Sequence, residues 1–447
     1  MNRSARQASL RNRRDAEIVI DGAGMEAERR PPLPPLAVLA GMSGNLMEWY
    51  DFALYGVLAA TLGGLFFPSD NRLLALLSVF GVFAAGYVMR LLGGAAFGHV
   101  ADRLGRRRAL LLSAACMAVA TALVGCLPTY ATAGLLAPVL FTLFRLVQGL
   151  SVGGEFTTSI AYLIEQAPPG RRALQGSMAG LSGGLGILLG SAVGNALFAI
   201  FTHEQILAWA WRLPFLLSVP LGLSLAVLRA TLPEDAPREP AADRRPSPVW
   251  RVLREHPATI VRGALLGWGP NAAFYALAVF LGSFLATEHI LPQQTALGLQ
   301  TTSIALMVIL TPLAGYLADR LGRRAVVTVG IAACAVGAIP LLAVLRDGTP
   351  TGDLFAELAF SICVIAALPA YQVWLAESFP RALRASGLGL AYNGAAGILG
   401  GTTPLACATL VELTGSVLAP GAYVAVACAI SLLIALRTPE TAGRKLA

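Results

Sequence analysis

The chain has 447 residues, of which 56% are hydrophobic and only 13% are charged, and its formal net charge is +8. A soluble globular domain carries roughly 25% charged residues, so this composition excludes a wholly water-exposed surface and indicates a protein solvated by lipid. No hydrophilic segment is long enough to form a basic domain, which argues against a nucleic-acid partner.

The first segment, residues 1–35, is a polar and arginine-rich tail that closes on Pro31-Pro32-Leu33-Pro34-Pro35. We expect this tail to be disordered, because it has little apolar surface to bury. No short apolar region with a cleavage site precedes the first long apolar segment, so we expect no removed signal peptide.

Twelve apolar segments follow, each close to the roughly 20 residues that a helix needs to cross a bilayer. They are continuous rather than alternating, which predicts helices and not the strands of a barrel. Six occupy residues 36–230, a polar and proline-rich linker covers 231–256, six more occupy 257–437, and 438–447 form a short tail. The helices are expected to begin near Leu36, Leu73, Ala109, Ala133, Ala173, Trp209, Pro257, Thr295, Ala325, Leu354, Arg384 and Ala419.

Basic residues are distributed asymmetrically among the connections between these segments. Most lie in the two tails, in the even-numbered connections or beside them, whereas Arg72, Arg212 and Arg346 lie in odd-numbered ones. Positive charge is enriched on the cytoplasmic side of membrane proteins. We therefore expect both termini to be cytoplasmic.

Residues that bind metals or nucleotides do not form a recognisable pattern. The 6 cysteines contain no C-x-x-C pair and the 4 histidines are scattered, so we expect neither disulfides nor a metal site. The glycine-rich runs lack the Lys-Ser/Thr of a phosphate-binding loop. The sequence therefore predicts no cofactor, no use of ATP and no enzymatic activity.

An internal repeat divides the chain into two halves. The heptapeptide Ala-Asp-Arg-Leu-Gly-Arg-Arg occurs at Ala101–Arg107 and again at Ala318–Arg324. A second pair of landmarks, Leu163-Ile164-Glu165 and Leu375-Ala376-Glu377, falls between the fourth and fifth helix of each half. Because each half has an even number of helices, we expect two bundles of the same orientation, related by an axis along the membrane normal.

These motifs resemble those of a known family. Gly98–Arg107 and Gly315–Arg324 resemble the G-x-x-x-D-R-x-G-R-R loop of the major facilitator superfamily, and Gly44–Phe52, Arg145–Phe156 and Trp211–Phe215 resemble its metabolite:proton symporter branch. The resemblance implies an all-α integral membrane protein of twelve transmembrane helices in two pseudo-symmetric six-helix bundles. It also implies a multi-pass monomer in the bacterial inner (plasma) membrane that handles solutes such as proline, betaine, shikimate, citrate or α-ketoglutarate.

Ionised side chains inside membrane helices are costly and mark functional candidates. Away from helix ends there are Glu48, Asp51, Arg90, Arg145 and Glu155, all in the first half. Three carboxylates against two arginines leave one excess negative charge, and a carboxylate in a site of low dielectric constant takes up a proton rather than stay unpaired. We expect Asp51 or Glu48 to carry the coupled proton, with Glu155 as a third candidate. The alternative is that either acid pairs permanently with an arginine and holds helices together.

Arg145 also suits a substrate carboxylate, because its planar guanidinium matches that group; the alternative is an intramolecular partner. In the second half the charges lie near segment ends, so the expected binding residues there are neutral. Trp49, Tyr50 and Tyr275 are candidates for cation–π contact with a cationic head, and packing is the alternative. The further candidates for substrate binding are Asn45, Arg90, Gln148, Asn271, Gln372 and Asn393.

The repeated loops have a separate expected role. The resemblance implies a cytoplasmic latch in which the Asp meets a helix N-terminus of the other half, and a carboxylate is favoured at that positive end of the helix dipole. Asp102, Arg103 and Arg106 would stabilise the outward-open state, and Asp319, Arg320 and Arg323 mirror them. The alternative is that these arginines only set topology.

The sequence thus predicts a secondary active transporter that moves a small carboxylate-bearing solute, an organic acid or a zwitterion, together with protons by alternating access. One alternative is a proton antiporter that exports metabolites or drugs. Such a protein usually has a glycine-proline motif at the end of helix five, where this chain has Gly194-Asn195-Ala196. The other alternative, a non-transporting sensor, would need a signalling domain or an extended tail. The expected partners are the solute, protons and the bilayer.

Overall fold

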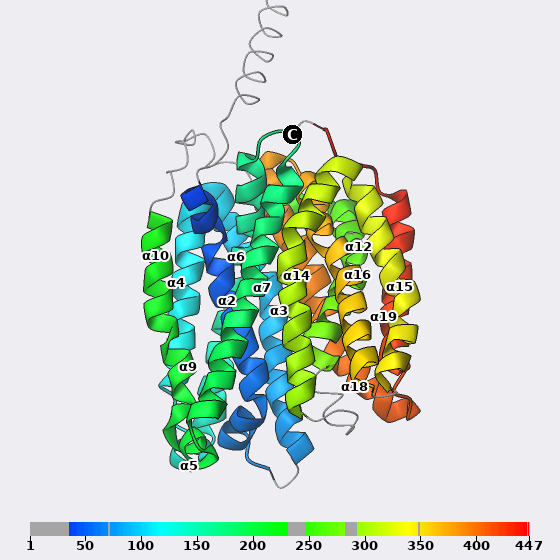
Figure 1. Cartoon of the computed structure of the whole chain (residues 1–447). Coiled ribbons are helices and arrows are strands. Elements are labelled where there is room, and N and C mark those ends of the chain that lie inside the picture. Colours follow the sequence, from blue (N-terminus) through cyan, green and yellow to red (C-terminus); the bar gives the residue numbers. More distant parts are fainter. Residues whose placement is uncertain are drawn as a thin grey trace, which may run out of the picture.

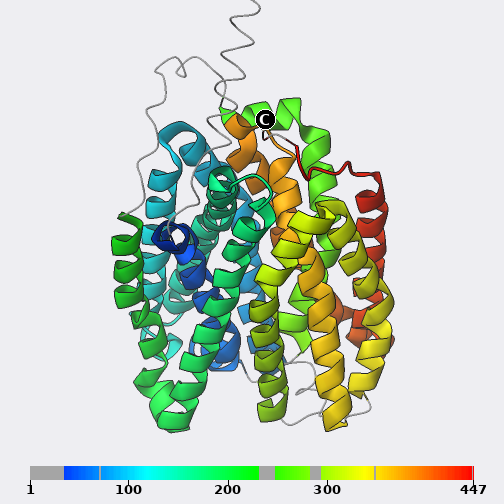
Figure 2. The same cartoon turned by 45° about the horizontal axis from the view of Figure 1, so that its top comes forward.

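A computed structural model describes residues 35–69, 72–230, 247–281, 293–346, 349–444 and 446. The predicted N-terminal tail, apart from its last residue, and most of the predicted linker lie outside these residues. The described chain forms long helices that run side by side in two groups, the first half beside the second, in both views (Figure 1, Figure 2). The start of the first helix and the C-terminus lie at the same end, the top of that view.

The first bundle contains six helical rods, of which the sixth is bent by 42° after Ala210. That bent rod begins at His203, upstream of the start near Trp209 that the hydropathy pattern predicts. The first five rods are α2 (Pro35–Phe66), α3 (Arg72–Leu104), α4 (Arg106–Gly125), α6 (Leu136–Gln166) and α7 (Arg172–Ile200), with the short α5 (Tyr130–Ala133) before α6. The sixth is built from α8 (His203–Gln205), η1 (Ile206–Ala210), α9 (Arg212–Leu216) and α10 (Ser218–Ala230).

The second bundle repeats this arrangement, with π-helical turns in its first and fifth rods. Its rods are α12 (Pro257–Tyr275) with η3 (Ala276–Leu281), α14 (Gln293–Leu321), α15 (Arg323–Arg346), α16 (Pro350–Glu377), the run η4 (Arg381–Leu383), α17 (Arg384–Asn393), η5 (Gly394–Gly400) and α18 (Thr403–Thr414), and α19 (Ala419–Arg437). One helix, α11 (Pro248–Glu255), lies within the predicted linker. The Ser247 hydroxyl caps it by accepting a bond from the Trp250 N–H at 3.2 Å, as expected for serine before a helix that starts with proline.

The length and composition of the rods agree with membrane crossing. Within the described residues, nine helices are long and apolar enough to span a membrane, and the bent sixth rod makes ten. α2 and α3 have 32 and 33 residues, so each extends about 48 Å at 1.5 Å per residue, more than the ~30 Å hydrocarbon core. All twelve predicted helices are therefore found, and the all-α, two-bundle fold is confirmed.

Glycines on α7 allow it to pack closely on both bundles. A Cβ atom added at Gly186 would lie 2.3 Å from the backbone oxygen of Leu46 on α2, in the same half. A Cβ added at Gly184 would lie 2.4 Å from the side chain of Val308 on α14, in the other half. Small residues permit such close approach between membrane helices. One face of α7 is thus fixed to its own bundle, while another face contacts the opposite bundle.

The repeated heptapeptide forms a tight reversal between two long helices in both halves. Gly105 precedes α4 with φ 101°, and Gly322 precedes α15 with φ 95°. Glycine adopts such positive φ values without the steric cost that other residues meet. The conserved geometry of the two copies explains why each repeat carries glycine at this place.

Candidate functional site

Two ion pairs lie inside the first bundle. Glu48 and Asp51 are one turn apart on α2 and therefore project from the same side of the helix. The Arg90 guanidinium on α3 donates from Nη2 to Glu48 Oε1 at 2.8 Å, and Arg145 on α6 donates from Nη1 to Asp51 Oδ2 at 2.6 Å. All four residues are buried, with exposures between 2% and 6%. Four of the five charges that the sequence places inside apolar segments thus form ion pairs, and the fifth, Glu155, does not take part in them.

The Asp51–Arg145 pair is enclosed by the first bundle. Gln148 donates its side-chain amide to Asp51 Oδ1 at 3.0 Å and to Thr121 Oγ1 at 2.8 Å, and the Thr121 hydroxyl lies 3.3 Å from the same carboxylate oxygen. The Arg145 guanidinium lies 3.9 Å from the centroid of the Tyr55 ring. Helices α2, α4 and α6 therefore all contribute to this pair.

The Glu48–Arg90 pair lies beside the boundary between the halves. Its guanidinium lies 4.9 Å from the centroid of the Tyr87 ring. The Tyr87 hydroxyl is hydrogen-bonded to the hydroxyl of Tyr275 from the second bundle at 3.3 Å, and the two rings meet edge to face at 5.6 Å. The Glu48–Arg90 pair is therefore connected through Tyr87 to a contact between the bundles.

Both pairs leave polar atoms without an intramolecular partner. Among the described residues, the buried atoms that lack a hydrogen bond include Arg145 Nε and Nη2, Arg90 Nε, Glu48 Oε2 and Gln148 Oε1. Buried polar atoms in folded proteins are almost always hydrogen-bonded. Their concentration between α2, α3 and α6 indicates a place prepared for a polar ligand that carries both acceptors and donors.

Two cavities lie next to each other at these residues. The smaller one, about 440 Å³, contains the two ion pairs and is lined by Glu48, Trp49, Asp51, Phe52, Gly86, Tyr87, Arg90, Met117, Arg145, Gln148, Gly149 and Val152. The larger one, about 580 Å³, lies between the bundles and takes its lining from both, including Trp49, Phe156, Gly180, Asn271, Phe274, Thr311, Gln372 and Tyr392. Trp49 lines both cavities, and its ring meets Phe274 of the second bundle edge to face at 5.6 Å. The indole therefore separates the charged cavity from the central one.

The neutral residues predicted in the second half fall into two groups. Asn271 and Gln372 line the central cavity, and the Gln372 amide lies 3.5 Å from the Tyr392 hydroxyl. Tyr275 lies at the boundary between the halves, as described. Asn393 lines neither cavity; its amide donates to the backbone oxygen of Gly153 at 2.8 Å and so joins α17 to α6.

Three residues of the first half lie away from both cavities. The Asn45 amide donates to Ser159 Oγ at 3.2 Å, and the Tyr50 hydroxyl donates to the Pro214 backbone oxygen at 2.7 Å. Glu155 is buried and its carboxylate accepts a hydrogen bond from Ser113 on α4. The expectation that Asn45 and Tyr50 contact substrate stays a prediction; in this conformation both side chains are hydrogen-bonded within the first bundle.

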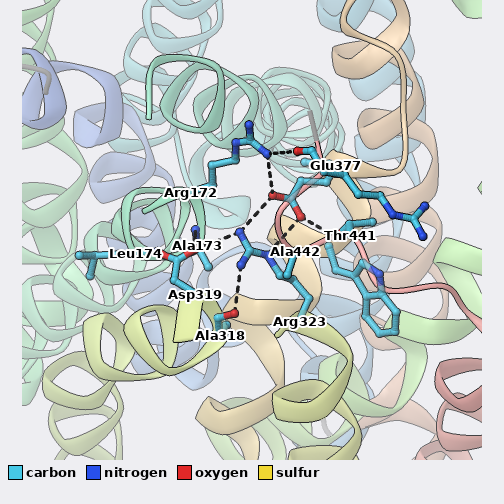
Figure 3. A network of polar contacts seen from close by, with 12 residues as sticks. Arg172, Ala173, Leu174, Ala318, Asp319, Arg323, Glu377, Thr441 and Ala442 are labelled. Atoms are coloured by element: carbon cyan, nitrogen blue, oxygen red, sulfur yellow. Dashed lines mark hydrogen bonds and ion pairs between the residues drawn. The ribbon is translucent and has the colours of Figure 1, made fainter. Parts of the chain in front are cut away.

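At the top of the molecule the second repeat joins the two halves (Figure 3). Asp319, at the end of α14, accepts hydrogen bonds from the backbone N–H groups of Ala173 and Leu174 at 3.0 and 2.9 Å. These groups begin α7, so the carboxylate meets the positive end of a helix dipole. Arg323 lies 2.9 Å from Asp319 and 3.1 Å from Glu377 at the end of α16. The bonds from Asp319 to α7 join the two bundles at this end, and Arg323 connects Asp319 to Glu377 within the second bundle.

The segment after α19 is tied to the same network. Glu440 accepts bonds from the backbone N–H groups of Arg323 and Arg324 at 3.1 and 2.9 Å, and the Thr441 hydroxyl donates to Glu377 at 2.6 Å. Burial alone would raise the pKa of the Glu440 carboxyl, but hydrogen bonds from backbone N–H groups outweigh burial and hold that pKa below its usual value. Sequence reasoning treated 438–447 only as a tail and missed this role; a Glu positioned to cap another helix has no local signature.

The first repeat packs against the second half at the equivalent place. A Cβ added at Gly98 would lie 3.0 Å from the Ser386 Cα at the start of α17, and Ala101 packs on Ala385. The side chains of Asp102 and Arg106 lie outside the described residues.

Two other arginines of the repeats lie at the surface, although both were predicted to take part in the latch. Arg103 is exposed, and so is Arg320, whose guanidinium lies 5.3 Å from the Tyr316 ring centroid. A further link between the halves, not predicted, is the pair Arg384–Glu165 at 3.0 Å. Glu165 belongs to the second pair of sequence landmarks, whereas Arg384 lies outside it.

Comparisons with known proteins agree with the fold and identify the family. Residues 42–404 and 271–446 match the model of the Major Facilitator Superfamily. The ectoine/proline transporter ProP of Corynebacterium glutamicum is 33% identical over 432 residues, covering 92% of this chain and 85% of the relative. The citrate-proton symporter of Klebsiella pneumoniae is 32% identical over 407 residues, covering 89% and 90%. The solved proton:xylose symporter XylE superposes with a TM-score of 0.74 over 92% of this chain and 97% of its own, at 19% identity, which shows the shared fold alone.

Proposed function

Because the chain belongs to the major facilitator superfamily and is a membrane transporter rather than an enzyme, we propose that it carries a small carboxylate-bearing solute together with protons across the bacterial inner membrane. Ectoine, proline and citrate, the solutes in the names of the two relatives, all carry a carboxylate, and one relative is named as a proton symporter. The observation that carries the proposal is the pair of buried arginines that share a cavity with two acids and retain unbonded N–H groups.

Arg145 is the proposed grip on the solute carboxylate. Its Nη1 donates to Asp51, while Nε and Nη2 have no partner among the described residues. A guanidinium donates two parallel bonds to a carboxylate through such neighbouring N–H groups. When a solute carboxylate joins Asp51 at this one arginine, two negative charges face one positive charge. Asp51 then takes up a proton, because burial in a medium of low dielectric constant disfavours the uncompensated charge.

The second pair is proposed to respond to the other end of the solute and to the second bundle. Glu48 Oε2 has no partner among the described residues and can accept a bond from the cationic end of a zwitterion. Protonation of Glu48 would weaken its hold on Arg90, whose neighbour Tyr87 contacts Tyr275. Glu48 is therefore the second candidate for the coupled proton. Glu155, which is bonded to Ser113 and lines neither cavity, is the third.

The central cavity is proposed to hold the body of the solute, with Asn271 and Gln372 as polar contacts and Trp49 as the partition. Transporters of this architecture expose a central site alternately to each side by rocking one bundle against the other. The cavity takes its lining from both bundles, as that motion requires. All these residues come from one chain, so we propose that the monomer is the working unit.

The network at Asp319 is proposed to be the latch that closes the cytoplasmic end. The basic residues in the even-numbered connections support a cytoplasmic location for that end and for both termini. Asp319 bonds the first residues of α7, and opening toward the cytoplasm must break these bonds. Arg323 connects Asp319 to Glu377 within the second bundle. Asp102, Arg103 and Arg106 are proposed to act at the equivalent place on α17, and Arg320 at the surface beside Asp319.

The test is uptake of radiolabelled solutes into proteoliposomes under an imposed pH gradient, across a panel of organic acids and zwitterions. We expect one or a few carboxylates to accumulate only when the outside is more acidic. Arg145→Lys keeps the charge but loses the planar fork, so it should raise the solute concentration needed for half-maximal uptake. Accumulation that ignores the pH gradient would remove the proton from the proposal, and extrusion of solute by the same gradient would favour an antiporter.

A further inference from the structure

A buried acid of the second bundle has no role in the site described so far. Glu357 on α16 is 0% exposed; Ser303 on α14 donates to its Oε2 at 2.5 Å, and its Oε1 has no partner. Asp353, one turn earlier on the same helix, is 1% exposed and neither of its oxygens has a partner. Because α16 begins at Pro350, Glu357 lies about 10 Å into the helix, deeper than the hydropathy pattern suggested.

The internal repeat gives Glu357 a counterpart. Arg145 lies 20 residues before Glu165, and Glu357 lies 20 residues before Glu377, where Glu165 and Glu377 belong to the matching landmarks of the two halves. The fourth rod of each bundle thus carries an ionisable residue at the same register. In the first bundle that residue is a cation with an acid opposite it. In the second bundle it is an acid with a hydroxyl opposite it.

The surroundings of Glu357 contain no compensating charge. It lines a cavity of about 420 Å³ whose other described walls are apolar and come from η3, α15, α16 and α19, among them Phe280, Leu341, Leu345, Phe360, Pro420 and Val424. Of the titratable or charged groups on these elements, Arg346 is exposed at the end of α15, and Tyr423 on α19 is bonded to Trp268 at 3.4 Å. Among the described residues, no arginine, lysine or histidine lies within ion-pair distance of Asp353 or Glu357. Glu288, His289 and Asp347 lie outside the described residues.

Two neighbouring buried carboxylates cannot both remain ionised in such a place, since each charge is poorly solvated and the two repel. We infer that Glu357 and Asp353 form a second proton-binding site, in the second bundle, and that Glu357 holds a proton in the conformation described. The ligand is a proton, which binds to a carboxylate oxygen and breaks no covalent bond of the protein. The pair titrates as a unit, because each acid feels the charge of the other.

The location separates this site from the two ion pairs of the first bundle. α16 runs from Pro350 to Glu377, and Glu377 belongs to the latch, so Glu357 lies toward the opposite end of the molecule (Figure 1). With the latch end in the cytoplasm, as proposed, the site lies near the outer face of the membrane. Only this point of the inference rests on the proposed function.

The direct test is infrared difference spectroscopy of the full-length protein in lipid nanodiscs during a pH titration, with the proton as the only added ligand. We expect a carboxylic-acid C=O band at neutral pH that Glu357→Gln removes. Glu412→Gln, the same change at an exposed acid of the same bundle, should leave it in place. Asp353→Asn should move the loss of the band to lower pH, because a neighbouring negative charge is gone. A spectrum of Glu357→Gln that equals that of the unchanged protein overturns the inference.

Two further arms complete the test. Ser303→Ala retains both acids and should shift the band in frequency, because the hydroxyl no longer donates to Glu357; a band that does not move contradicts the assignment, even where Glu357→Gln fails to fold. Replacing potassium by sodium should leave the band unchanged, and its loss in sodium would make the site a sodium site and overturn the inference. Asp51→Asn should keep the band, so a failure of proton-coupled uptake and a failure of this site are distinguished.

Discussion

The two bundles place an ionisable side chain at the same register of their fourth rod and surround it differently. Arg145 in the first bundle is paired with Asp51 at 2.6 Å, next to a cavity that contains a second ion pair. Glu357 in the second bundle faces the Ser303 hydroxyl and an apolar cavity. Duplication has thus preserved the packing of the helices while the charges have diverged. On our proposals, Arg145 of the first half pairs with the solute carboxylate as well as with Asp51. Glu357 of the second half is neutralised by a proton.

The largest expected effect comes from removing the cation of the first bundle. Arg145→Gln leaves Asp51 buried without its partner, and breaking a buried ion pair from one side costs about 3–5 kcal/mol of stability. The double variant Arg145→Gln/Asp51→Asn should recover most of the lost stability but should not recover uptake. The melting temperature and the solute uptake of each variant test this expectation. Glu357→Gln, at the matching register, should change stability much less. An equal loss for Glu357→Gln would mean that its charge has a partner, which would break the comparison.

A second contrast lies within α7. Gly186→Ala places a methyl group 2.3 Å from the Leu46 backbone oxygen, which cannot move aside easily, so we expect a loss of about 1–3 kcal/mol in stability from overpacking. Gly180→Ala is the matched control on the face toward the second bundle, where the nearest atom, on Thr311, is 3.6 Å away. Thermal unfolding in detergent measures both. Equal losses for the two variants would contradict the difference in free space around Gly186 and Gly180.

The latch offers a third contrast, between the two ends of the molecule. Asp319→Asn weakens bonds to the start of α7 and removes a charge at a helix N-terminus, a loss of about 1–2 kcal/mol. We expect this change to shift the population toward the state open to the cytoplasm and to slow net uptake, with solute affinity unchanged. Distances between spin labels at the two ends report the population. Lost solute binding with unchanged distances would place Asp319 in the binding site instead.

The smallest effect is expected at Glu440, outside the membrane helices. Its pKa is held below the ordinary 4.5, so the stabilisation is present above that value and is lost as the pH falls below it through the folded-state pKa. The side chain is partly exposed, and screening by water limits the effect to less than about 1 kcal/mol. Unfolding measured at neutral pH and just below pH 4.5 should therefore show a difference between the unchanged protein and Glu440→Gln that shrinks on acidification. A constant difference would assign the effect to packing.

Much of the fold follows from the sequence. Apolar segments of this length must be helical in lipid, and the repeated heptapeptide indicates two bundles related by symmetry. The approach of Glu48, Asp51, Arg90, Arg145 and Gln148 was also predictable, since buried charges in one bundle must find each other. The pairing was not predictable, because which arginine faces which acid depends on the rotation of α3 and α6 about their axes.

Other features depend on tertiary contacts that leave no local pattern. Asn45 and Tyr50 lie on the expected helix but face α6 and α9. Glu357 was not among the residues singled out from the sequence, because the hydropathy pattern starts that helix near Leu354 rather than at Pro350 and leaves Glu357 close to its end. Glu440 caps a helix more than a hundred residues away in sequence, and only folding brings them together.

The central claim is that protonation of a buried acid of the first bundle must accompany movement of the solute. Gradient-driven accumulation compared with solute exchange at equal pH, for Asp51→Asn and Glu48→Gln in proteoliposomes, tests it most directly. We predict that at least one of the two variants still exchanges solute across the membrane but no longer accumulates it. Full accumulation by both variants would contradict the account.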